Sequence, residues 1–124
     1  MSQLFTLESA NEAVAIIRPL LAEILQIRQE ILEKQPELWP ALEKSRGNGG
    51  NRPASEVALK FKRLETLVRR IQDIGAEIKD INTGLVDFPS IRDGRKVCLC
   101  WQYGEEEIQY WHDLDAGFAG RQPL

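Results

Sequence analysis

Apolar residues recur at three- and four-residue spacing over the first third of the chain, which is typical of an α-helix. The first apolar row of this predicted helix consists of Ala10, Val14, Ile17, Leu21, Ile24 and Ile31. A second row beside it consists of Ile16, Leu20 and Ile27. Together they cover about half of the helix circumference, which exceeds the roughly 100° stripe of a simple amphipathic helix. We therefore expect this helix to have two packing neighbours.

The ends and the interior of this helix carry further signals. Thr6 is the predicted N-cap, and Ser9 with Glu12 forms an alternative capping box. Pro19 lies inside the apolar run, where it lacks the amide hydrogen of other residues and its ring crowds the preceding turn. We expect a kink or a short break near Arg18.

A second helix is predicted after a connector over about residues 35–55. This connector holds three prolines and three glycines, so we expect it to be flexible. Ser55 is the predicted cap of the second helix, and Gly75 ends it at a position that favours a left-handed conformation. The apolar face of this helix consists of Val57, Phe61, Leu64, Val68 and Ile71. Residues 6–75 are therefore predicted to form a helical hairpin.

After the second helix the apolar period changes from near four to two, which indicates β-strands. The predicted strands span about residues 77–81, 85–91, 95–103 and 108–114. Helices followed by strands are typical of an α+β fold. We expect a long N-terminal helical hairpin packed on a small C-terminal antiparallel sheet over residues 76–124, within a single domain of residues 1–124.

Turn sequences predict how the strands pair. Asp93 and Gly94 are typical of a two-residue hairpin, which pairs Arg92 with Arg95. The further pairs that this turn predicts are Phe88 with Leu99 and Val86 with Trp101. A loop of two or four residues within GEEE is expected to join the last two strands.

This pairing assigns each strand residue to one of two faces. The face expected against the helices carries Val86, Phe88, Val97, Leu99, Trp101, Ile108, Tyr110 and His112. The opposite face carries Asp87, Cys98, Cys100, Gln102, Gln109, Trp111 and Asp113. Burial of large apolar side chains, at roughly 1.5–3 kcal/mol each, is expected to hold the sheet on the helices.

His112, the single histidine, and Asp115 are the candidate catalytic residues. A histidine at the margin of the core can act as an acid or base, or it can be a hydrogen-bonded structural residue, and both interpretations stay open. The acids Asp87, Asp113 and Asp115 can bind a divalent cation or act as a general acid–base pair. The alternative is that these acids only face solvent.

Cys98 and Cys100 are expected on one face of their strand. One intervening residue is fewer than zinc motifs normally have, so a zinc site would need both thiolates and two acids such as Asp87 and Asp113. Zinc prefers softer ligand sets. We therefore interpret the cysteines as small buried apolar residues, and we predict no metal and no cofactor.

The tail and the hairpin tip suggest sites for a small ligand or anion. Gly117 and Gly120 allow consecutive backbone amides to point at an anion, which Arg121 can complete. The alternative is a bend that places Phe118 in the core. The candidate ligand- or anion-binding residues are Arg121, Arg92, Arg95, Gly117, Gly120, Asp87 and Trp111.

Net charge and hydropathy exclude several classes of partner. A net charge of −3 and a pI near 5.2 disfavour general binding to nucleic acid or to anionic membranes. No apolar stretch is long enough to span a bilayer, and the start of the chain lacks a signal-peptide pattern. We expect a cytoplasmic protein whose cysteines stay reduced.

The segments TGLVDFPSIRDGRKVCLCW and GEEEIQYWHDLDAGFAGRQPL resemble the bacterial and archaeal domain-of-unknown-function family 2203. The resemblance extends from FTLESANEAV to the end of the chain and implies no particular activity. The matching motif residues are Asp87, Phe88, Pro89, Arg92, Gly94, Arg95, Cys100, Trp101, Gly104, Glu105, Trp111, His112, Gly117, Phe118, Gly120 and Arg121.

Two classes of function remain. The first is a cytoplasmic binding or scaffolding module that forms a homodimer through coiled-coil packing of its helices and docks a protein or a small anionic ligand. The second is a small enzyme, or a metal- or anion-dependent protein, with a site of C-terminal His, Asp and Arg residues. The sequence shows no recognisable nucleophile–base pair, phosphate loop or metal cluster, which argues against the second class and favours the first. Whether the protein is an enzyme stays open.

Overall fold

The computed structural model of the chain describes residues 4–34, 36, 39–40 and 56–124. Two long helices precede a five-stranded antiparallel sheet with the strand order β1-β2-β3-β4-β5. The elements are α1 (Leu7–Lys34), α3 (Glu56–Ile74), β1 (Glu77–Asp80), β2 (Leu85–Arg92), β3 (Arg95–Gln102), β4 (Tyr110–Asp113), the 3-10 helix η1 (Phe118–Gly120) and β5 (Gln122–Pro123). The predicted α+β arrangement is confirmed. The predicted cap at Ser55 and most of the predicted connector lie outside the described residues.

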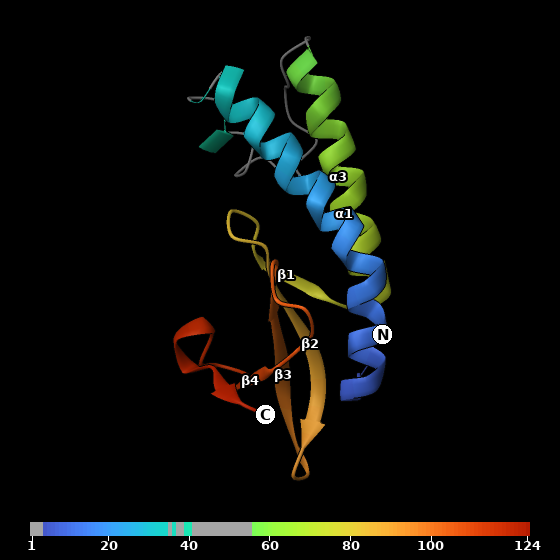
Figure 1. The fold of residues 1–124 in the computed structure, drawn as a ribbon, viewed down its shortest axis with the longest axis vertical. Helices are drawn as coiled ribbons and strands as arrows, with labels where there is room; N and C mark the ends of the chain where they lie inside the picture. The colour runs from blue at the N-terminus through green and yellow to red at the C-terminus, as the bar shows by residue number, and fades with distance from the viewer. Residues whose placement is uncertain (1–3, 35, 37–38, 41–55) are drawn as a thin grey trace.

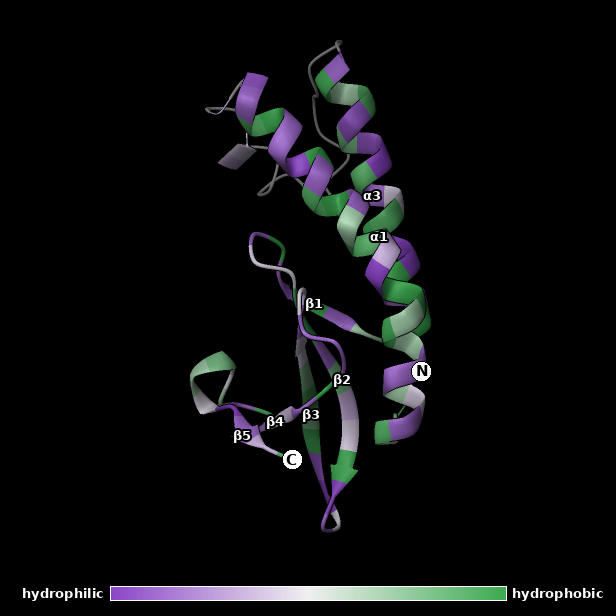
Figure 2. Ribbon diagram, in the orientation of Figure 1, coloured by the Kyte–Doolittle hydropathy of each residue, from purple (hydrophilic) through white to green (hydrophobic). Residues whose placement is uncertain are grey.

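The helices and the sheet form two layers. α1 and α3 run side by side in opposite directions, and their upper ends extend beyond the sheet (Figure 1). Apolar and polar residues alternate along both helices, as amphipathic packing requires (Figure 2). Neither helix in the described part of the chain is long and apolar enough to cross a membrane.

The start of α1 is capped by reciprocal hydrogen bonds. The Ser9 amide donates to Oγ1 of Thr6 at 3.0 Å, and the Thr6 amide donates to Oγ of Ser9 at 2.9 Å. Thr6 is therefore the N-cap that the sequence predicts. The helix continues through Pro19, so the predicted break does not occur. Ile17 and Leu21, which flank Pro19, are fully buried and hold both sides of this turn against the core.

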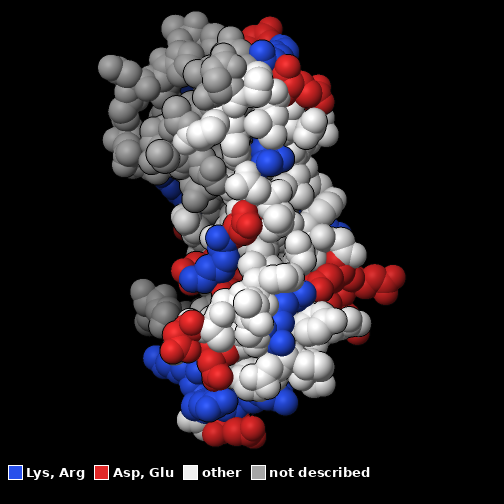
Figure 3. Space-filling view, turned by 90° about the vertical axis from the view of Figure 1, so that its left-hand side faces the viewer, with Lys and Arg blue, Asp and Glu red and all other residues white. Residues whose placement is uncertain are grey.

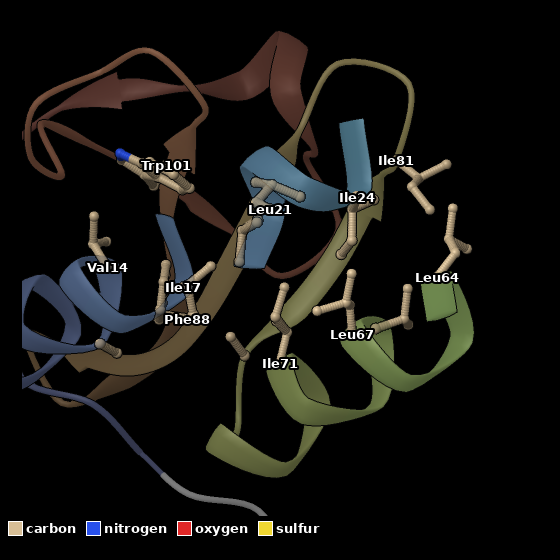
Figure 4. Close-up of a cluster of buried hydrophobic side chains, with 14 of the residues drawn as sticks. Val14, Ile17, Leu21, Ile24, Leu64, Leu67, Ile71, Ile81, Phe88 and Trp101 are labelled. Carbon is tan, nitrogen blue, oxygen red and sulfur yellow. The ribbon is translucent and has the colours of Figure 1, made fainter. Parts of the chain in front are cut away.

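The core lies where α1 meets both α3 and the sheet. Val14 and Ile17 lie beside Phe88 of β2, whereas Ile24 lies beside Leu67 of α3 (Figure 4). Trp101 is fully buried in the same cluster. The two neighbours predicted for the first helix are therefore the second helix and the sheet.

The β2–β3 hairpin has the predicted register. Arg92 faces Arg95 across a two-residue turn, and both turn residues have positive φ, 53° at Asp93 and 80° at Gly94. These angles are those of a type I′ turn, which matches the twist of the two strands. The predicted pairs Phe88 with Leu99 and Val86 with Trp101 are also present.

The register between β3 and β4 differs from the prediction by one residue. Leu99 faces Trp111 and Cys98 faces His112, whereas the sequence predicts His112 on the face of Leu99. A shift of one residue turns every side chain of a strand to the other face. Trp111 therefore joins the core, and His112 lies on the outer face, away from the helices. The residues whose predicted face is wrong are Tyr110, Trp111, His112 and Asp113.

The reason for this difference is the long connection between β3 and β4. Seven residues, 103–109, separate the strands, rather than the predicted two or four. Arg18 of α1 donates to the carbonyl oxygens of Glu105 at 3.1 Å and Glu106 at 2.6 Å. The Ile108 amide donates to the Asn11 side chain at 2.8 Å. Contacts with a helix about ninety residues away hold this loop open, and neighbouring residues do not encode them.

The C-terminal tail covers the outer face of the sheet. η1 lies on the side of the sheet opposite the helices, and β5 pairs with β4 (Figure 1). Asp87 on this face is only 1% exposed, so the alternative of a solvent-facing acid is wrong for this residue. The outer face is therefore a second buried layer, and it holds polar side chains.

Candidate functional site

Three side chains with metal-ligating or acid–base chemistry meet on the outer face of the sheet. Asp87 of β2 lies directly opposite Cys100 of β3, and His112 of β4 lies opposite Cys98. Paired residues of antiparallel strands share a face, so these side chains are neighbours. One ligand atom each from Asp87, Cys100 and His112 lies within 4.8 Å of the other two, and all three residues are buried. We call these three residues the outer-face cluster.

His112 has a polar partner at each ring nitrogen. Nδ1 lies 2.7 Å from the carbonyl oxygen of Asp113, and because a carbonyl only accepts, Nδ1 donates. Nε2 lies 3.0 Å from each carboxylate oxygen of Asp87. The Nδ1 hydrogen bond thus makes Nε2 the atom that is available for a cation or a second proton.

The contact between Nε2 and Asp87 requires a shared proton or a bound cation. When Nδ1 holds the ring proton, Nε2 presents a lone pair, and both carboxylate oxygens do the same. The side chains of His112 and Asp87 are 3% and 2% exposed, so bulk water does not screen this repulsion. A second proton on the ring, which makes a buried ion pair, satisfies the contact. A metal ion that both side chains bind also satisfies it.

The two cysteines near this contact are free and buried. Burial, with a smaller effect of the Asp87 carboxylate, raises the pKa of the Cys100 thiol to about 11. The same two causes raise the pKa of Cys98 to about 11. Both thiols therefore keep their protons at neutral pH, and neither is a reactive nucleophile in the metal-free chain.

A cavity of about 250 Å³ adjoins the outer-face cluster. Its lining residues are Lys79, Leu85, Asp87, His112, Leu114, Asp115, Gly117 and Phe118. Four of the residues singled out from the sequence thus meet at one cavity, namely Asp87, His112, Asp115 and Gly117. Polar groups converge there between apolar walls, which is the usual composition of a small-molecule site.

Arg121 lies apart from this cavity and has protein partners. Its Nη2 donates to both carboxylate oxygens of Glu105, at 2.8 and 3.1 Å. Its guanidinium carbon lies 4.2 Å from the centre of the Tyr110 ring and 4.9 Å from that of Phe118. These contacts tie η1 and the tail to the sheet. Gly120 packs tightly in the same bend, where an added Cβ would lie 2.5 Å from that of Ala116.

Arg92, Arg95 and Trp111 come together on the face of the sheet that carries the core. The guanidinium carbons of Arg92 and Arg95 lie 5.0 and 5.9 Å from the centre of the Trp111 ring. Arg95 also forms an ion pair with Asp113 at 3.1 Å. The prediction that Trp111 shares a face with Asp87 is wrong, because the register places them on opposite faces of the sheet.

The sequence did not predict that His112 and Cys100 belong to one cluster. The zinc set considered from the sequence held Cys98, Cys100, Asp87 and Asp113, which assumed the wrong face for β4. One signal for the correct face was available, since Trp111 is a larger apolar side chain than His112 and buries more area in a core.

Charges on the surface are mixed. On the face drawn in Figure 3, lysine and arginine side chains are interspersed with aspartate and glutamate and with neutral residues. This pattern fits the net charge of −3 and offers no extended field of one sign on that face. The buried outer-face cluster is therefore a better guide to function than surface charge.

A helical hairpin on an antiparallel sheet, with a buried His, Asp and Cys cluster beneath the tail, defines an α+β protein with a candidate ligand site inside its sheet layer. The family model described as "Uncharacterized conserved protein (DUF2203)" matches residues 3–124, and the chain belongs to this family. Comparison with curated proteins and with solved structures found no match.

Proposed function

We propose that this protein binds a divalent transition metal of the zinc type through Asp87, Cys100 and His112. The observation that carries the proposal is the orientation of His112. Its Nε2 faces both oxygens of a buried carboxylate, while its Nδ1 donates to a backbone carbonyl. A histidine that ligates a metal commonly has such a hydrogen bond on its other nitrogen.

The chemistry of the three side chains fits a zinc-type ion. Imidazole nitrogen, thiolate sulfur and carboxylate oxygen are all zinc ligands. One carboxylate and one thiolate together balance a charge of +2, so the loaded cluster would be neutral inside the protein. Catalytic zinc sites have three protein ligands and leave one position for water or substrate. Asp87 and His112 also line the cavity, which offers space for a small molecule beside these two residues.

These features support a metal-dependent role that acts on or binds a small molecule. In such a role Asp87, Cys100 and His112 hold the ion, which would supply Lewis-acid chemistry when bound. Leu85, Leu114 and Phe118 give the cavity apolar walls, and Lys79 and Asp115 offer charged groups to a bound molecule.

Titration of chelator-treated protein with Zn²⁺ and Co²⁺ tests this proposal. We expect one ion per chain by calorimetry, and a thiolate-to-cobalt charge-transfer band. Cys100→Ala should remove this band, and Cys100→Ala and His112→Gln should each weaken binding by at least about 100-fold. Cys98→Ala is the matched control, because Cys98 lies on the same strand face but outside the outer-face cluster.

The proposal fails if no stoichiometric binding occurs, or if Cys98→Ala weakens binding as much as Cys100→Ala does. Near-ultraviolet circular dichroism of each variant shows whether the sheet is intact. Cys100→Ala or His112→Gln protein that is folded yet binds the metal as the wild type does also contradicts the proposal.

Self-association through the helices is a second proposal. Exposed apolar side chains on both helices support it, Ile16 on α1 at 57% and Leu59 on α3 at 71%. Most of the apolar surface of α1 is already buried against α3 and the sheet within one chain. Light scattering at tens of micromolar tests the proposal, and a monomeric mass would overturn it.

A further inference from the structure

A second cavity, of about 400 Å³, lies between the first turn of α1 and the β2–β3 hairpin. Its lining residues are Leu4, Phe5, Thr6, Leu7, Ser90, Ile91, Arg92, Leu99 and Leu124. Figure 1 shows the start of α1 beside the lower part of β2, the two elements that contribute most of the lining. It shares no residue with the cavity of the outer-face cluster.

The walls of this cavity hold much of the exposed apolar surface. Among the described residues, nine large apolar side chains are exposed, and four of them line it: Leu4, Leu7, Ile91 and Leu124. Each of the four is between 41% and 49% exposed. Exposed apolar side chains that gather at one concave site, rather than singly, are typical of a binding surface.

Arg92 provides the cationic group of this cavity. Its guanidinium stacks over Trp111 and has no carboxylate partner among the residues that the structure describes. The neighbouring Arg95 stacks on the same ring, but its charge is balanced by Asp113 at 3.1 Å. Arg92 is therefore a cation that no described carboxylate pairs with, and it lines a largely apolar cavity.

We propose that this cavity binds a small aliphatic monocarboxylate. The carboxylate pairs with the Arg92 guanidinium, which presents planar donors that suit a carboxylate. The hydrocarbon chain lies against Leu4, Leu7, Ile91 and Leu124. This site is independent of the metal proposed for the outer-face cluster.

The composition of the cavity favours this class over other anions. A single arginine matches one negative charge, and the described residues of the lining include no other basic side chain for a polyphosphate. Phe5 is 4% exposed and packs edge-on against Phe88, so it offers no free ring on which a nucleobase could stack. A volume of about 400 Å³ lies within the range of small-molecule sites.

Calorimetric or NMR titration with butanoate, hexanoate and octanoate tests the proposal. Affinity should rise by about fourfold for each added CH₂ until the cavity is filled. Arg92→Gln should weaken octanoate binding by at least about tenfold, because a charge-assisted hydrogen bond is lost. Arg95→Gln is the matched control and should change the affinity by less than about twofold, because the Arg95 charge is already paired.

Two further measurements test the contact of the hydrocarbon chain with the apolar walls and the independence of this site from the proposed metal. Ile91→Ser should weaken octanoate binding more than butanoate binding, whereas Leu59→Ser, on the exposed face of α3, should change neither. Chelator-treated and Zn²⁺-loaded protein should bind octanoate equally, so failure of the metal proposal would leave this result intact.

The proposal is overturned if octylamine binds as well as octanoate, or if affinity does not depend on chain length. It is also overturned if Arg95→Gln weakens binding as much as Arg92→Gln does. Inorganic phosphate that binds more tightly than octanoate would assign the Arg92 site to a different class of anion.

Discussion

His112 and Asp87 form a buried polar contact, whereas Arg95 and Asp113 form an exposed one. The side chains of the first pair are at most 3% exposed, and those of the second pair are 63% and 39% exposed. Solvent screens the exposed pair and leaves the buried pair at full strength. The two pairs lie in the same sheet, so they contrast a buried polar contact with an exposed one.

Asp87→Ala should lower the free energy of unfolding of metal-free protein by about 1–3 kcal/mol. The reason is that His112 Nε2 loses its acceptor in a site that water does not reach. Arg95→Ala, the control, should lower it by only about 0–1 kcal/mol. Urea denaturation measures both values. Equal losses for the two variants would contradict the conclusion that the buried Asp87–His112 contact contributes more to stability than the exposed Arg95–Asp113 pair.

α1 and α3 are joined by ion pairs along their exposed edges as well as by their apolar faces. Arg63 donates to Glu23 at 2.7 Å, and Lys60 donates to Glu30 at 2.8 Å. The hydrogen bond from Arg63 holds the pKa of Glu23 below its usual value of 4.5. The hydrogen bond from Lys60 does the same for the pKa of Glu30.

The stability from these two pairs should depend on pH. A carboxylate whose pKa is lowered in the folded state stabilises the protein above the unfolded pKa, near 4.5, and loses this effect as pH falls through the lower folded value. Wild type should therefore have a higher Tm than Glu23→Gln/Glu30→Gln at neutral pH, and the difference should vanish in acid. High salt should reduce the difference at neutral pH. A difference that is constant between pH 7 and pH 3 would contradict this prediction.

Two glycines with positive φ differ in their surroundings. Gly84 precedes β2 with φ +75°, and an added Cβ would lie 2.8 Å from Cβ of Tyr103. Gly94 in the β2–β3 turn has φ +80°, and an added Cβ would meet nothing within 4 Å. Both positions disfavour an L side chain through the backbone, but only Gly84 adds a steric clash.

Gly84→Ala should destabilise the protein more than Gly94→Ala. Gly94→Ala should cost about 1–2 kcal/mol, the backbone penalty alone. Gly84→Ala should add to this penalty the displacement of Tyr103, which follows β3 and whose amide donates to the Gly84 carbonyl oxygen at 2.9 Å. Thermal unfolding of both variants measures the difference, and equal values would show that the chain at Gly84 moves aside freely.

The molecule has two buried layers on one sheet, the helix-covered core and the tail-covered outer face. Arg121 links the tail to the sheet through Glu105, and its guanidinium lies between Tyr110 and Phe118. Gly117 and Phe118 of this tail line the cavity beside the outer-face cluster.

Arg121→Ala should loosen the tail and make the thiols of the metal-free protein accessible. In the wild type both cysteines are buried, and the pKa of each is about 11, so a disulfide reagent should react slowly. The variant should react several times faster while its helices remain intact by circular dichroism. Arg69→Ala, on the exposed face of α3, is the control and should react at the wild-type rate. An unchanged rate in Arg121→Ala would show that the tail stays closed without this contact.

The features that the sequence predicted correctly depend on residues close together along the chain. Spacing and capping predicted both helices, with Thr6 at the start of the first and Gly75, at φ 108°, at the end of the second. The Asp93–Gly94 turn predicted the first hairpin with its register, because the turn type and the pairing are set by the same two residues. The parallel bridge of Phe5 with Ser90 and the short strand β5 were not predicted, since each consists of few residues without a periodic pattern.

By itself, the sequence determined the helices, the strands and the first hairpin, since each depends on residues that are close along the chain. The tertiary structure alone decided the face of β4, because Arg18 and Asn11 of α1 hold the seven-residue loop that sets its register. That register places His112 beside Asp87 and Cys100 rather than in the core. A shift of one residue in a strand costs little in local conformation but exchanges its two faces, so only long-range packing could select the candidate site.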